Sequence, residues 1–184
     1  MNADALKADL TALAPNTKRA IVANLPYNVA TPLLIGWLEQ IRNDKNNFDS
    51  MTLMFQKEVA DRISAKPDTK AYGRLSILCQ WLCNVQNCFI LPPSAFTPPP
   101  KIKSGVVHFT PKTLQGNAPD FKSVGQLTAA AFGQRRKMLR SSLSNYSDAL
   151  EKAGILPTKR AENLTVEQFI QIAGLTRTGE TTRA

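Results

Sequence analysis

The sequence contains little of what a metal site or a disulfide framework requires. Its 184 residues include three cysteines, Cys79, Cys83 and Cys88, and one histidine, His108. A zinc site needs about four suitably spaced ligands, so this set predicts no metal centre. Cys79 and Cys83 lie among leucines in a predicted helix, which indicates buried thiols in a reducing compartment. His108 alternates with apolar neighbours, which is typical of a structural residue.

Long apolar segments are also missing. No run of about 18 apolar residues occurs, so no transmembrane helix is predicted. The first ten residues contain Asp4 and Asp9 and lack the apolar core of a secretion signal. These absences predict a cytoplasmic protein, with an organelle matrix as the alternative. The composition, 43% hydrophobic and 20% charged, is typical of a globular chain of one domain or two small ones.

Acidic residues are outnumbered by basic ones. Lys and Arg number 23 against 14 Asp and Glu, a net charge of +9, which favours a polyanionic partner. The excess is spread, with 13 basic and 8 acidic side chains in residues 1–114 and 10 and 6 in residues 115–184. Arg135, Arg136, Lys137 and Arg140 form the densest group. A merely solvated basic surface is the alternative interpretation.

Strand and helix patterns alternate through residue 113. Strands are predicted around 21–23, 50–55, 85–91 and 106–109, and helices over 56–65 and 72–84. Another helix is predicted after Thr31 as N-cap, with Pro32 at its first position. This alternation is typical of an α/β sheet.

Beyond residue 113 the pattern becomes helical. A polar segment at 113–119 reads as a linker, and helices are predicted at 121–132, 137–143, 147–153 and 165–173. Gly154 and Gly174 are predicted C-cap residues. We therefore expect two domains, residues 1–113 and residues 114–184, the second small and all-helical.

The segment Asn24-Leu25-Pro26-Tyr27 follows a buried strand, where open α/β sheets place their chemistry. The Asn24 amide offers both donors and acceptors, Pro26 stiffens the loop, and Tyr27 offers a flat face with a polar tip. Such a set suits a planar, amine-bearing ring such as a nucleobase. An ordinary strand-end turn with a packed tyrosine is the alternative.

This segment resembles motif IV of the S-adenosylmethionine-dependent RNA adenine N6-methyltransferases. Further stretches match in order and spacing, and the likeness runs from residue 2 to about 175. These stretches are Asn2-Ala-Asp-Ala-Leu6, Gln56-Lys-Glu-Val-Ala-x-Arg62, Tyr72-Gly-Arg-Leu-Ser76, Phe96-x-Pro-x-Pro-Lys-x-x-Ser-x-Val106 and Ala131-Phe-Gly-Gln-Arg-Arg-Lys-x-Leu139. The chain is most similar to the small-subunit ribosomal RNA adenine dimethyltransferases, the KsgA-type enzymes.

The resemblance implies a fold and site roles. The expected fold is α/β, the C-terminal part of a Rossmann-like methyltransferase sheet followed by a small helical domain. Asn24 and a backbone carbonyl of Leu25-Pro26 would accept the adenine N6 amine, so that the base is oriented for attack. Tyr27 and Phe96 would stack on the extruded base. Ordinary packing is the alternative for Phe96.

The same resemblance implies a cofactor and a partner. S-adenosylmethionine is the implied methyl donor, held through Asp4 and Asn24. The implied partner is small-subunit ribosomal RNA or a pre-30S-type particle. RNA phosphates would meet the basic residues Lys101, Lys103, Arg135, Arg136, Lys137 and Arg140.

One part of the family pattern is missing from this sequence. Members begin with a glycine-rich strand–loop–helix that cradles the cofactor, and no such segment precedes Asp4. We therefore expect residues 1–113 to be a partial methyltransferase catalytic domain with an incomplete cofactor site. The isolated chain is expected to bind S-adenosylmethionine weakly or not at all, and to expose a sheet edge.

The sequence leaves alternatives open. A non-catalytic RNA-binding or ribosome-assembly module would keep the base pocket and basic surface without methyl transfer. The large-subunit antibiotic-resistance methylases share the architecture, and a mitochondrial transcription-factor relative is a further possibility. Leu25 and the long helical region favour the small-subunit enzymes. The modified adenosines, the number of methyl groups and the oligomeric state are not specified by the sequence.

Overall fold

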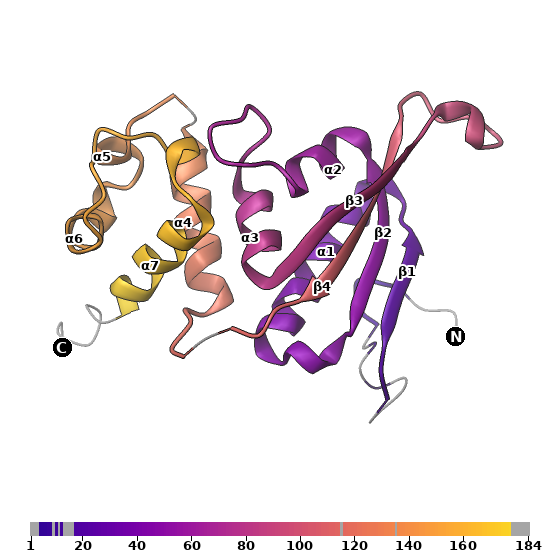
Figure 1. Ribbon diagram of the computed structural model, residues 1–184, viewed down its shortest axis with the longest axis horizontal. Helices are drawn as coiled ribbons and strands as arrows, with labels where there is room; N and C mark the ends of the chain where they lie inside the picture. Colours follow the sequence, from indigo (N-terminus) through magenta and orange to yellow (C-terminus); the bar gives the residue numbers. More distant parts are fainter. Residues whose placement is uncertain are drawn as a thin grey trace. The chain divides into compact units, whose positions relative to one another are not determined.

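The computed structural model describes residues 4–8, 10, 12, 17–114, 116–134 and 136–177. They form two compact units. The first contains the described residues up to Ser64 together with Leu82–Thr113, and the second contains Ala65–Trp81 together with the described residues from Leu114 onward. Figure 1 shows a sheet with helices in the first unit and helices without strands in the labelled part of the second. The predicted α/β class is confirmed.

A four-stranded sheet organises the first unit. Its strands are β1 (Ala20–Asn24), β2 (Ser50–Gln56), β3 (Cys83–Leu91) and β4 (Ser104–Pro111), in the order β1-β2-β4-β3. The pair β1 and β2 is parallel, whereas β4 runs antiparallel to both β2 and β3. The carboxyl ends of β1, β2 and β3 therefore lie at one edge of the sheet, beside the amino end of β4.

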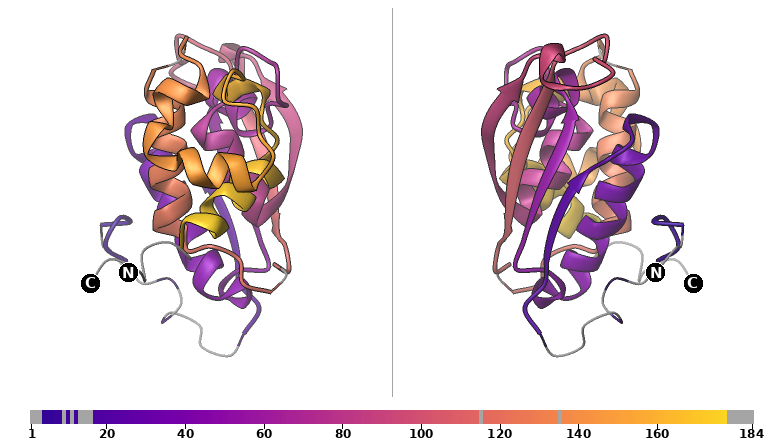
Figure 2. Two further views of the ribbon diagram at one scale, coloured as in Figure 1. Left: turned by 90° about the vertical axis from the view of Figure 1, so that its left-hand side faces the viewer. Right: turned by 90° about the vertical axis from the view of Figure 1, so that its right-hand side faces the viewer.

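One face of this sheet is packed against helices. Alternate residues of β2, namely Met51, Leu53 and Phe55, are fully buried. Helix α1 (Tyr27–Asn43) lies along a face of the sheet (Figure 2) and buries residues at helical spacing. These are Ala30, Leu33, Leu34, Trp37, Leu38 and Ile41. Helix α2 (Lys57–Ile63) follows β2 directly and buries Ala60 and Ile63.

The other face of the sheet is more open. Val22, in β1, is 81% exposed. Val22 pairs with Thr52 of β2, and Thr52 pairs in turn with His108 of β4. The Thr52 hydroxyl and Nδ1 of His108 form a hydrogen bond of 2.8 Å. His108 therefore has the structural role that its alternating neighbours predict.

Helix α1 begins earlier than the sequence predicts. The expected N-cap was Thr31, with Pro32 at the first helical position, but the helix starts at Tyr27 and Pro32 lies inside it. Pro26 is the actual N-cap residue, and its carbonyl accepts from the N–H groups of Val29 and Ala30, each at 3.1 Å. An internal proline removes one i→i−4 donor, and here the carbonyl that loses it belongs to the exposed Asn28.

The second unit has an aromatic core. Its helices are α3 (Arg74–Leu82), α4 (Phe121–Gly133), α5 (Leu139–Ser142), α6 (Ser147–Lys152) and α7 (Val166–Arg177). Phe132 contacts Tyr72 edge-on at 6.2 Å and Phe169 at 5.8 Å between ring centroids. Trp81 stacks on Phe121 at 6.4 Å. Residues that precede β3 in the chain and residues that follow β4 thus share one core.

Three local predictions need correction. The helix expected over 137–143 is shorter, because Met138 pairs in extended form with Arg160 and α5 starts only at Leu139. Gly174 lies inside α7, not at a helix end. Cys83 is buried, as predicted, but it begins β3 and not a helix turn.

The unit boundaries bear on the two expected domains. Thr113 ends the second stretch of the sheet unit, and the helical unit also contains Ala65–Trp81, which precedes that boundary in the chain. Gly154, with φ of +66°, ends α6 in the conformation predicted for a C-cap glycine. The division into a catalytic part, residues 1–113, and an RNA-binding part, residues 114–184, stays a prediction.

Candidate functional site

The strand register brings two chemically distinctive loops to the same edge of the sheet. Asn24 is the last residue of β1, and Gln56 is the last of β2. Ser104, the first residue of β4, pairs with Gln56 on one side and with Leu91 of β3 on the other. The Asn24–Tyr27 loop and the proline-rich loop between β3 and β4 therefore leave the sheet at one edge.

The Asn24–Tyr27 loop presents polar groups on a rigid base. Asn24 and Pro26 are exposed, whereas Leu25 is 8% exposed and anchors the loop in the core. Pro26 has φ of −58° and caps α1, where its carbonyl is already occupied by two helix N–H groups. Leu25, whose carbonyl has no such helix contact among the described backbone hydrogen bonds, directly precedes this cap in the chain.

A hydrogen bond ties the two loops together. The Tyr27 hydroxyl lies 2.8 Å from Oγ of Ser104, which is fully buried. Tyr27 is itself half-buried at the first position of α1. This bond fixes the position of the tyrosine ring relative to the start of β4. Sequence reasoning gave Ser104 no role of its own, although it stands in the matched Phe96–Val106 stretch.

The proline-rich loop is tightly folded. A short 3-10 turn, Pro93–Ala95, is closed by N–H donation from Ala95 to Pro92 (3.0 Å) and from Phe96 to Pro93 (3.2 Å). Phe96 is half-buried just after this turn. Phe96 and Tyr27, both within the described part of the chain, make no ring contact with each other, so their predicted joint stacking on a base stays a prediction.

Lys101 and Lys103 are exposed on the segment leading into β4. The carbonyl of Lys103 accepts from the N–H of Lys57 at 2.9 Å, which joins this segment to the start of α2. The ammonium of Lys57 forms an ion pair with Asp61 at 2.6 Å. The loop end is therefore held by α2, and the two predicted phosphate-contacting lysines leave it toward solvent.

Asp4 lies in a turn near the start of the described chain. Its Oδ1 accepts from the N–H of Leu6 at 3.0 Å, and the residue is exposed. The predicted contact of Asp4 with a cofactor adenine stays a prediction. No group of three or more potential metal ligands occurs among the described residues.

The predicted basic cluster is larger than the sequence suggests. Arg136, Lys137 and Arg140 are exposed, and Arg135 lies outside the described residues. The segment Met138–Arg140 pairs with Pro157–Arg160: the N–H of Leu139 donates to Lys159 at 2.7 Å and that of Arg140 donates to Pro157 at 2.9 Å.

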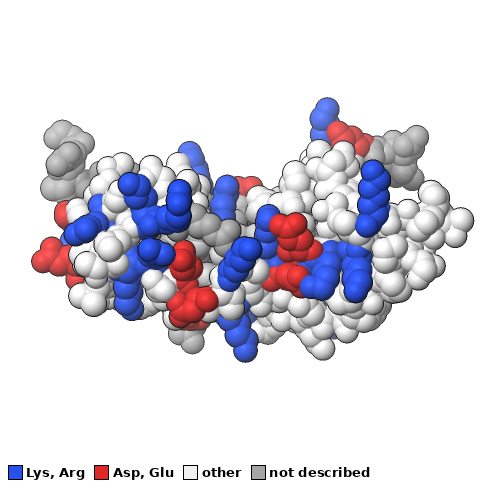
Figure 3. Space-filling model, turned by 90° about the horizontal axis from the view of Figure 1, so that it is seen from above, with Lys and Arg blue, Asp and Glu red and all other residues white. Residues whose placement is uncertain are grey.

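We call the cations of these two paired segments the basic strip. They are Arg136, Lys137, Arg140, Lys159 and Arg160. Among the described residues no carboxylate forms an ion pair with any of them, while the two pairs that occur in α2 join Lys57 to Asp61 and Arg62 to Glu58. Figure 3 shows Lys and Arg side chains gathered over the helical unit. Lys159 and Arg160 were missed because nothing in a single sequence reveals this backbone pairing.

Two buried groups have shifted ionisation. Burial raises the pKa of the Cys83 thiol to about 12, although the nearby Lys112 ammonium opposes the shift. Burial also raises the pKa of the Tyr72 hydroxyl, and the Glu167 carboxylate adds to that effect. Both groups therefore stay neutral at physiological pH.

A family model described as "Ribosomal RNA adenine dimethylase" matches residues 1–177. This chain belongs to the ribosomal RNA adenine dimethylase family. The resemblance seen in the Asn24–Tyr27 segment and the later stretches is thereby confirmed. No helix in the described residues is long and apolar enough to cross a membrane.

Curated relatives share about half of the chain's residues. A protein of Gluconobacter oxydans named "Ribosomal RNA small subunit methyltransferase A" is 51% identical over 174 residues, covering 94% of this chain and 56% of the relative. The protein of the same name from Brucella canis is 53% identical over 175 residues, covering 92% and 62%. The chain thus spans less than two thirds of the length of these relatives.

Solved structures of methyltransferases share the fold. A dimethyladenosine transferase from Plasmodium falciparum superimposes with a TM-score of 0.73 at 25% identity, covering 98% of this chain and 72% of that one. The 23S ribosomal RNA methyltransferase ErmE superimposes with a TM-score of 0.63 at 20% identity, covering 94% and 69%. The Rossmann-like character of the sheet unit is confirmed.

Proposed function

We propose that this chain carries the base-recognition part of an enzyme that transfers methyl groups from S-adenosylmethionine to N6 of adenosines in small-subunit ribosomal RNA, in the cytoplasm. The observation that carries the proposal is the Asn24–Tyr27 loop, which begins at the carboxyl end of β1 and is tied to β4 through Ser104. Family membership and relatives named as small-subunit methyltransferases support it.

The loop suits an adenine amine. The N6 lone pair is delocalised into the ring, so it must be oriented before it attacks an electrophilic methyl group. The Asn24 side-chain oxygen and a backbone carbonyl are the acceptors for the two amine hydrogens. Because the Pro26 carbonyl already accepts from Val29 and Ala30, we assign the second acceptor to Leu25.

Two aromatic rings would hold the base. Tyr27 is fixed through Ser104, and Phe96 follows the short turn of the proline-rich loop. Stacking on such rings is worth about 1–3 kcal/mol per base, and it offsets the cost of unstacking the adenosine from RNA. Lys101, Lys103 and the basic strip, with Arg135, would contact the phosphates.

Part of the donor set for S-adenosylmethionine is present. The Asp4 carboxylate is exposed and uses Oδ1 for the Leu6 N–H, and the Asn24 amide is exposed at the strand end. These residues would hold the adenine and the methyl-bearing end of the cofactor, which supplies an electrophilic methyl group when bound. The chain's own task is to orient the adenosine amine.

The test is a tritiated-methyl assay on small ribosomal subunits that lack adenine dimethylation, with the 184-residue chain and with Asn24→Ala. Transfer that falls by about a hundredfold or more in the variant, with RNA affinity unchanged, supports the proposal. RNA binding without any transfer by the parent chain would agree with the expected incomplete cofactor site as well as with the non-catalytic module. Equal transfer by parent and variant would contradict the role of Asn24.

The contribution of the basic strip is tested separately through salt. Replacing Arg136 and Arg160 together by Ala should weaken RNA binding. It should also reduce the steepness of the plot of log binding constant against log salt concentration by about 1–2, because each phosphate contact contributes roughly 0.7–0.9. Arg62→Ala is the matched control, since Arg62 is ion-paired with Glu58 in α2. A slope unchanged by the double replacement would contradict the phosphate contacts.

A further inference from the structure

A cavity of about 550 Å3 lies in the helical unit, and the proposed methyl transfer does not use it. Its volume falls in the range of small-molecule sites, about 300–1,000 Å3. Most of its wall is aliphatic, and its lining includes Arg140, Leu143, Leu150, Ile155, Leu156 and Pro157.

The cavity shares a wall with the basic strip. Arg140 belongs to both, and its N–H donates to the carbonyl of Pro157, another lining residue, at 2.9 Å. The pairing of Met138 with Arg160 extends the same backbone contact. The backbone that carries Arg140 is therefore joined by hydrogen bonds to the backbone that carries part of the apolar wall.

Apolar side chains near the strip are open to solvent. Leu156 is 63% exposed and Met138 is 38% exposed. Exposed apolar atoms next to cations that form no ion pair within the described part of the chain favour a ligand that offers both a flat apolar face and negative charge. A nucleotide of single-stranded RNA has these properties, because its base presents π-faces and its backbone carries phosphates.

The rim of the cavity offers groups for a base edge. Ser144 and Ser147 contribute hydroxyl groups, which donate and accept, and Glu151 contributes a carboxylate. A carboxylate accepts from exocyclic amines such as N4 of cytosine. The site therefore suits a base with an exocyclic amine better than uracil, which lacks one.

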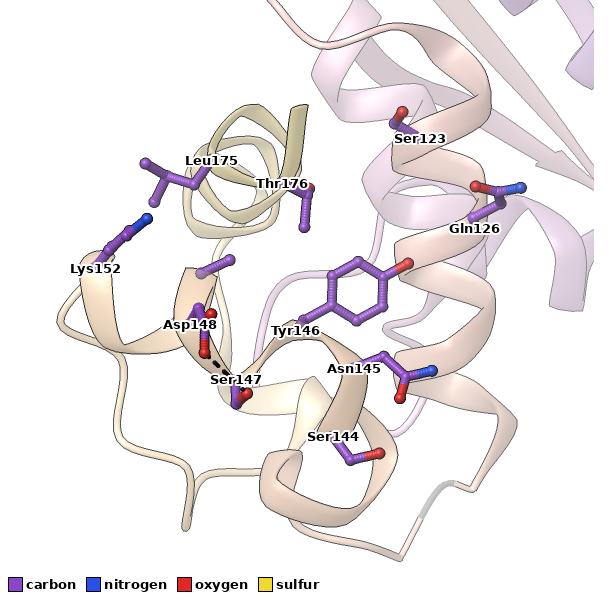
Figure 4. A pocket seen from close by; sticks show the side chains of 11 residues that line it. Ser123, Gln126, Ser144, Asn145, Tyr146, Ser147, Asp148, Lys152, Leu175 and Thr176 are labelled. Carbon is purple, nitrogen blue, oxygen red and sulfur yellow. Dashed lines mark hydrogen bonds between the residues drawn. The ribbon is translucent and has the colours of Figure 1, made fainter. Parts of the chain in front are cut away.

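A second cavity of about 530 Å3 adjoins the first and is the competing location. Ser144 and Ser147 line both cavities. Figure 4 shows the second one, with the Tyr146 ring pointing toward the helix that carries Gln126 and with Asp148 accepting a hydrogen bond of 3.3 Å from the Ser147 hydroxyl. Its lining is mostly polar, whereas the lining of the first cavity is mostly aliphatic and includes Arg140 of the basic strip.

We infer that the helical unit binds one unstacked RNA nucleotide, with its base in the apolar cavity under Leu156 and its flanking phosphates on the basic strip. The inference rests on the proposed function, because it takes RNA as the ligand. It adds a second base-binding site, which reads RNA without modifying it.

The test uses the 184-residue chain and a small-subunit RNA hairpin with one bulged 2-aminopurine. Binding should raise the fluorescence, because the base leaves its stacked neighbours for an aliphatic site. Leu156→Asp should abolish this rise and weaken binding by about tenfold, as expected for one lost base contact. Leu6→Asp is the matched control, since Leu6 is 53% exposed and lies in the other unit. It should change neither signal.

An abasic nucleotide at the bulge separates the outcomes. On abasic RNA, Leu156→Asp should weaken binding no more than Leu6→Asp does, because the abasic nucleotide has no base to place in the cavity. The inference would be overturned if Leu156→Asp weakened binding equally on normal and abasic RNA. It would also be overturned if a leucine-rich amphipathic peptide displaced the fluorescent base while adenosine monophosphate and cytidine monophosphate did not. RNA binding with no effect of the abasic site rejects only this cavity. No RNA binding at low salt rejects the proposed function as well.

Discussion

The Tyr27–Ser104 hydrogen bond fixes the position of the tyrosine ring in the proposed base site. Ser104 is buried, so Ser104→Ala leaves the tyrosine hydroxyl without this partner and should lower the free energy of unfolding by about 1 kcal/mol. Methyl transfer should fall as well, because the ring loses its fixed position. Denaturant unfolding and the tritium assay measure the two effects.

A double-mutant cycle with Tyr27→Phe provides the control. Both replacements remove the same hydrogen bond, so their effects on unfolding should be less than additive, with a coupling of about 0.5–1.5 kcal/mol. Strictly additive losses would mean that the two hydroxyl groups act independently.

Because of Cys83, the free energy of unfolding should depend on pH in the alkaline range. Burial raises the pKa of its thiol to about 12 in the folded state, whereas the unfolded thiol titrates near 8.5–9. Above the unfolded pKa only the unfolded chain releases the proton, so the free energy of unfolding falls by up to about 1.4 kcal/mol per pH unit until the folded pKa is reached. Cys83→Ala should flatten this fall.

The slope in the alanine variant need not reach zero. Tyr72, whose pKa is also raised, contributes in the same direction above about pH 10. Equilibrium denaturation between pH 8 and 11 gives both slopes. A variant slope equal to the parent slope would place the thiol in an environment less buried than the structure has it.

Single residues were predictable where their chemistry is local. A loop after a strand is predicted from residue type and spacing alone at Asn24, Pro26 and Tyr27. Ser104 acquires its role only because the sheet register sets it beside Gln56 and the Tyr27 hydroxyl. Lys159 and Arg160 join the basic strip only through backbone pairing across a loop. Such long-range contacts leave no pattern in a single sequence.

At the scale of elements, two glycines give opposite predictions. A Cβ at Gly105 in β4 would lie 2.7 Å from Cβ of Ala60 in α2, so Gly105→Ala should cost about 1–3 kcal/mol of unfolding free energy through overpacking. Gly36 lies inside α1 with no heavy atom within 4 Å of such a Cβ. Gly36→Ala should therefore stabilise by about 0.5–1 kcal/mol, as helix propensity requires.

Thermal unfolding of the two alanine variants checks both signs. Both variants carry the same glycine-to-alanine replacement in the same chain, so each serves as the control for the other. Destabilisation by Gly36→Ala, or no effect of Gly105→Ala, would show that α1 or the contact between α2 and β4 differs from the described packing.

Element boundaries were harder to predict than element types. The strands and most helices follow from apolar periodicity, but α1 begins at Tyr27 because a proline cap at Pro26 competes with the equally plausible Thr31-Pro32 start. The helix expected from 137 is shortened because Met138 pairs with Arg160. In the first case two local start signals compete, and in the second a tertiary contact outweighs local propensity.

At the scale of the whole molecule, the helical unit depends on a segment from the middle of the chain. Tyr72 and Trp81, from Ala65–Trp81, contact Phe132 and Phe121 in the later helices. A fragment of residues 114–184 would expose these aromatic faces, so we expect it to lack cooperative unfolding. Adding a peptide of residues 65–81 should restore helicity and a thermal transition.

Circular dichroism and calorimetry of the fragment with and without the peptide check this expectation. A peptide with Tyr72 and Trp81 both replaced by Ala is the control and should not restore the transition. A fragment that melts cooperatively by itself would show that α4, α5, α6 and α7 suffice for a stable core.

This arrangement also fixes an order of events during protein synthesis. The ribosome releases Tyr72 and Trp81 before it makes Phe121 and Phe132, with the whole of β3 and β4 in between. The nascent chain must therefore carry two large unpaired aromatic side chains until the later helices emerge. We expect this interval to be the time when newly made chains most need chaperones, since exposed apolar surface promotes aggregation.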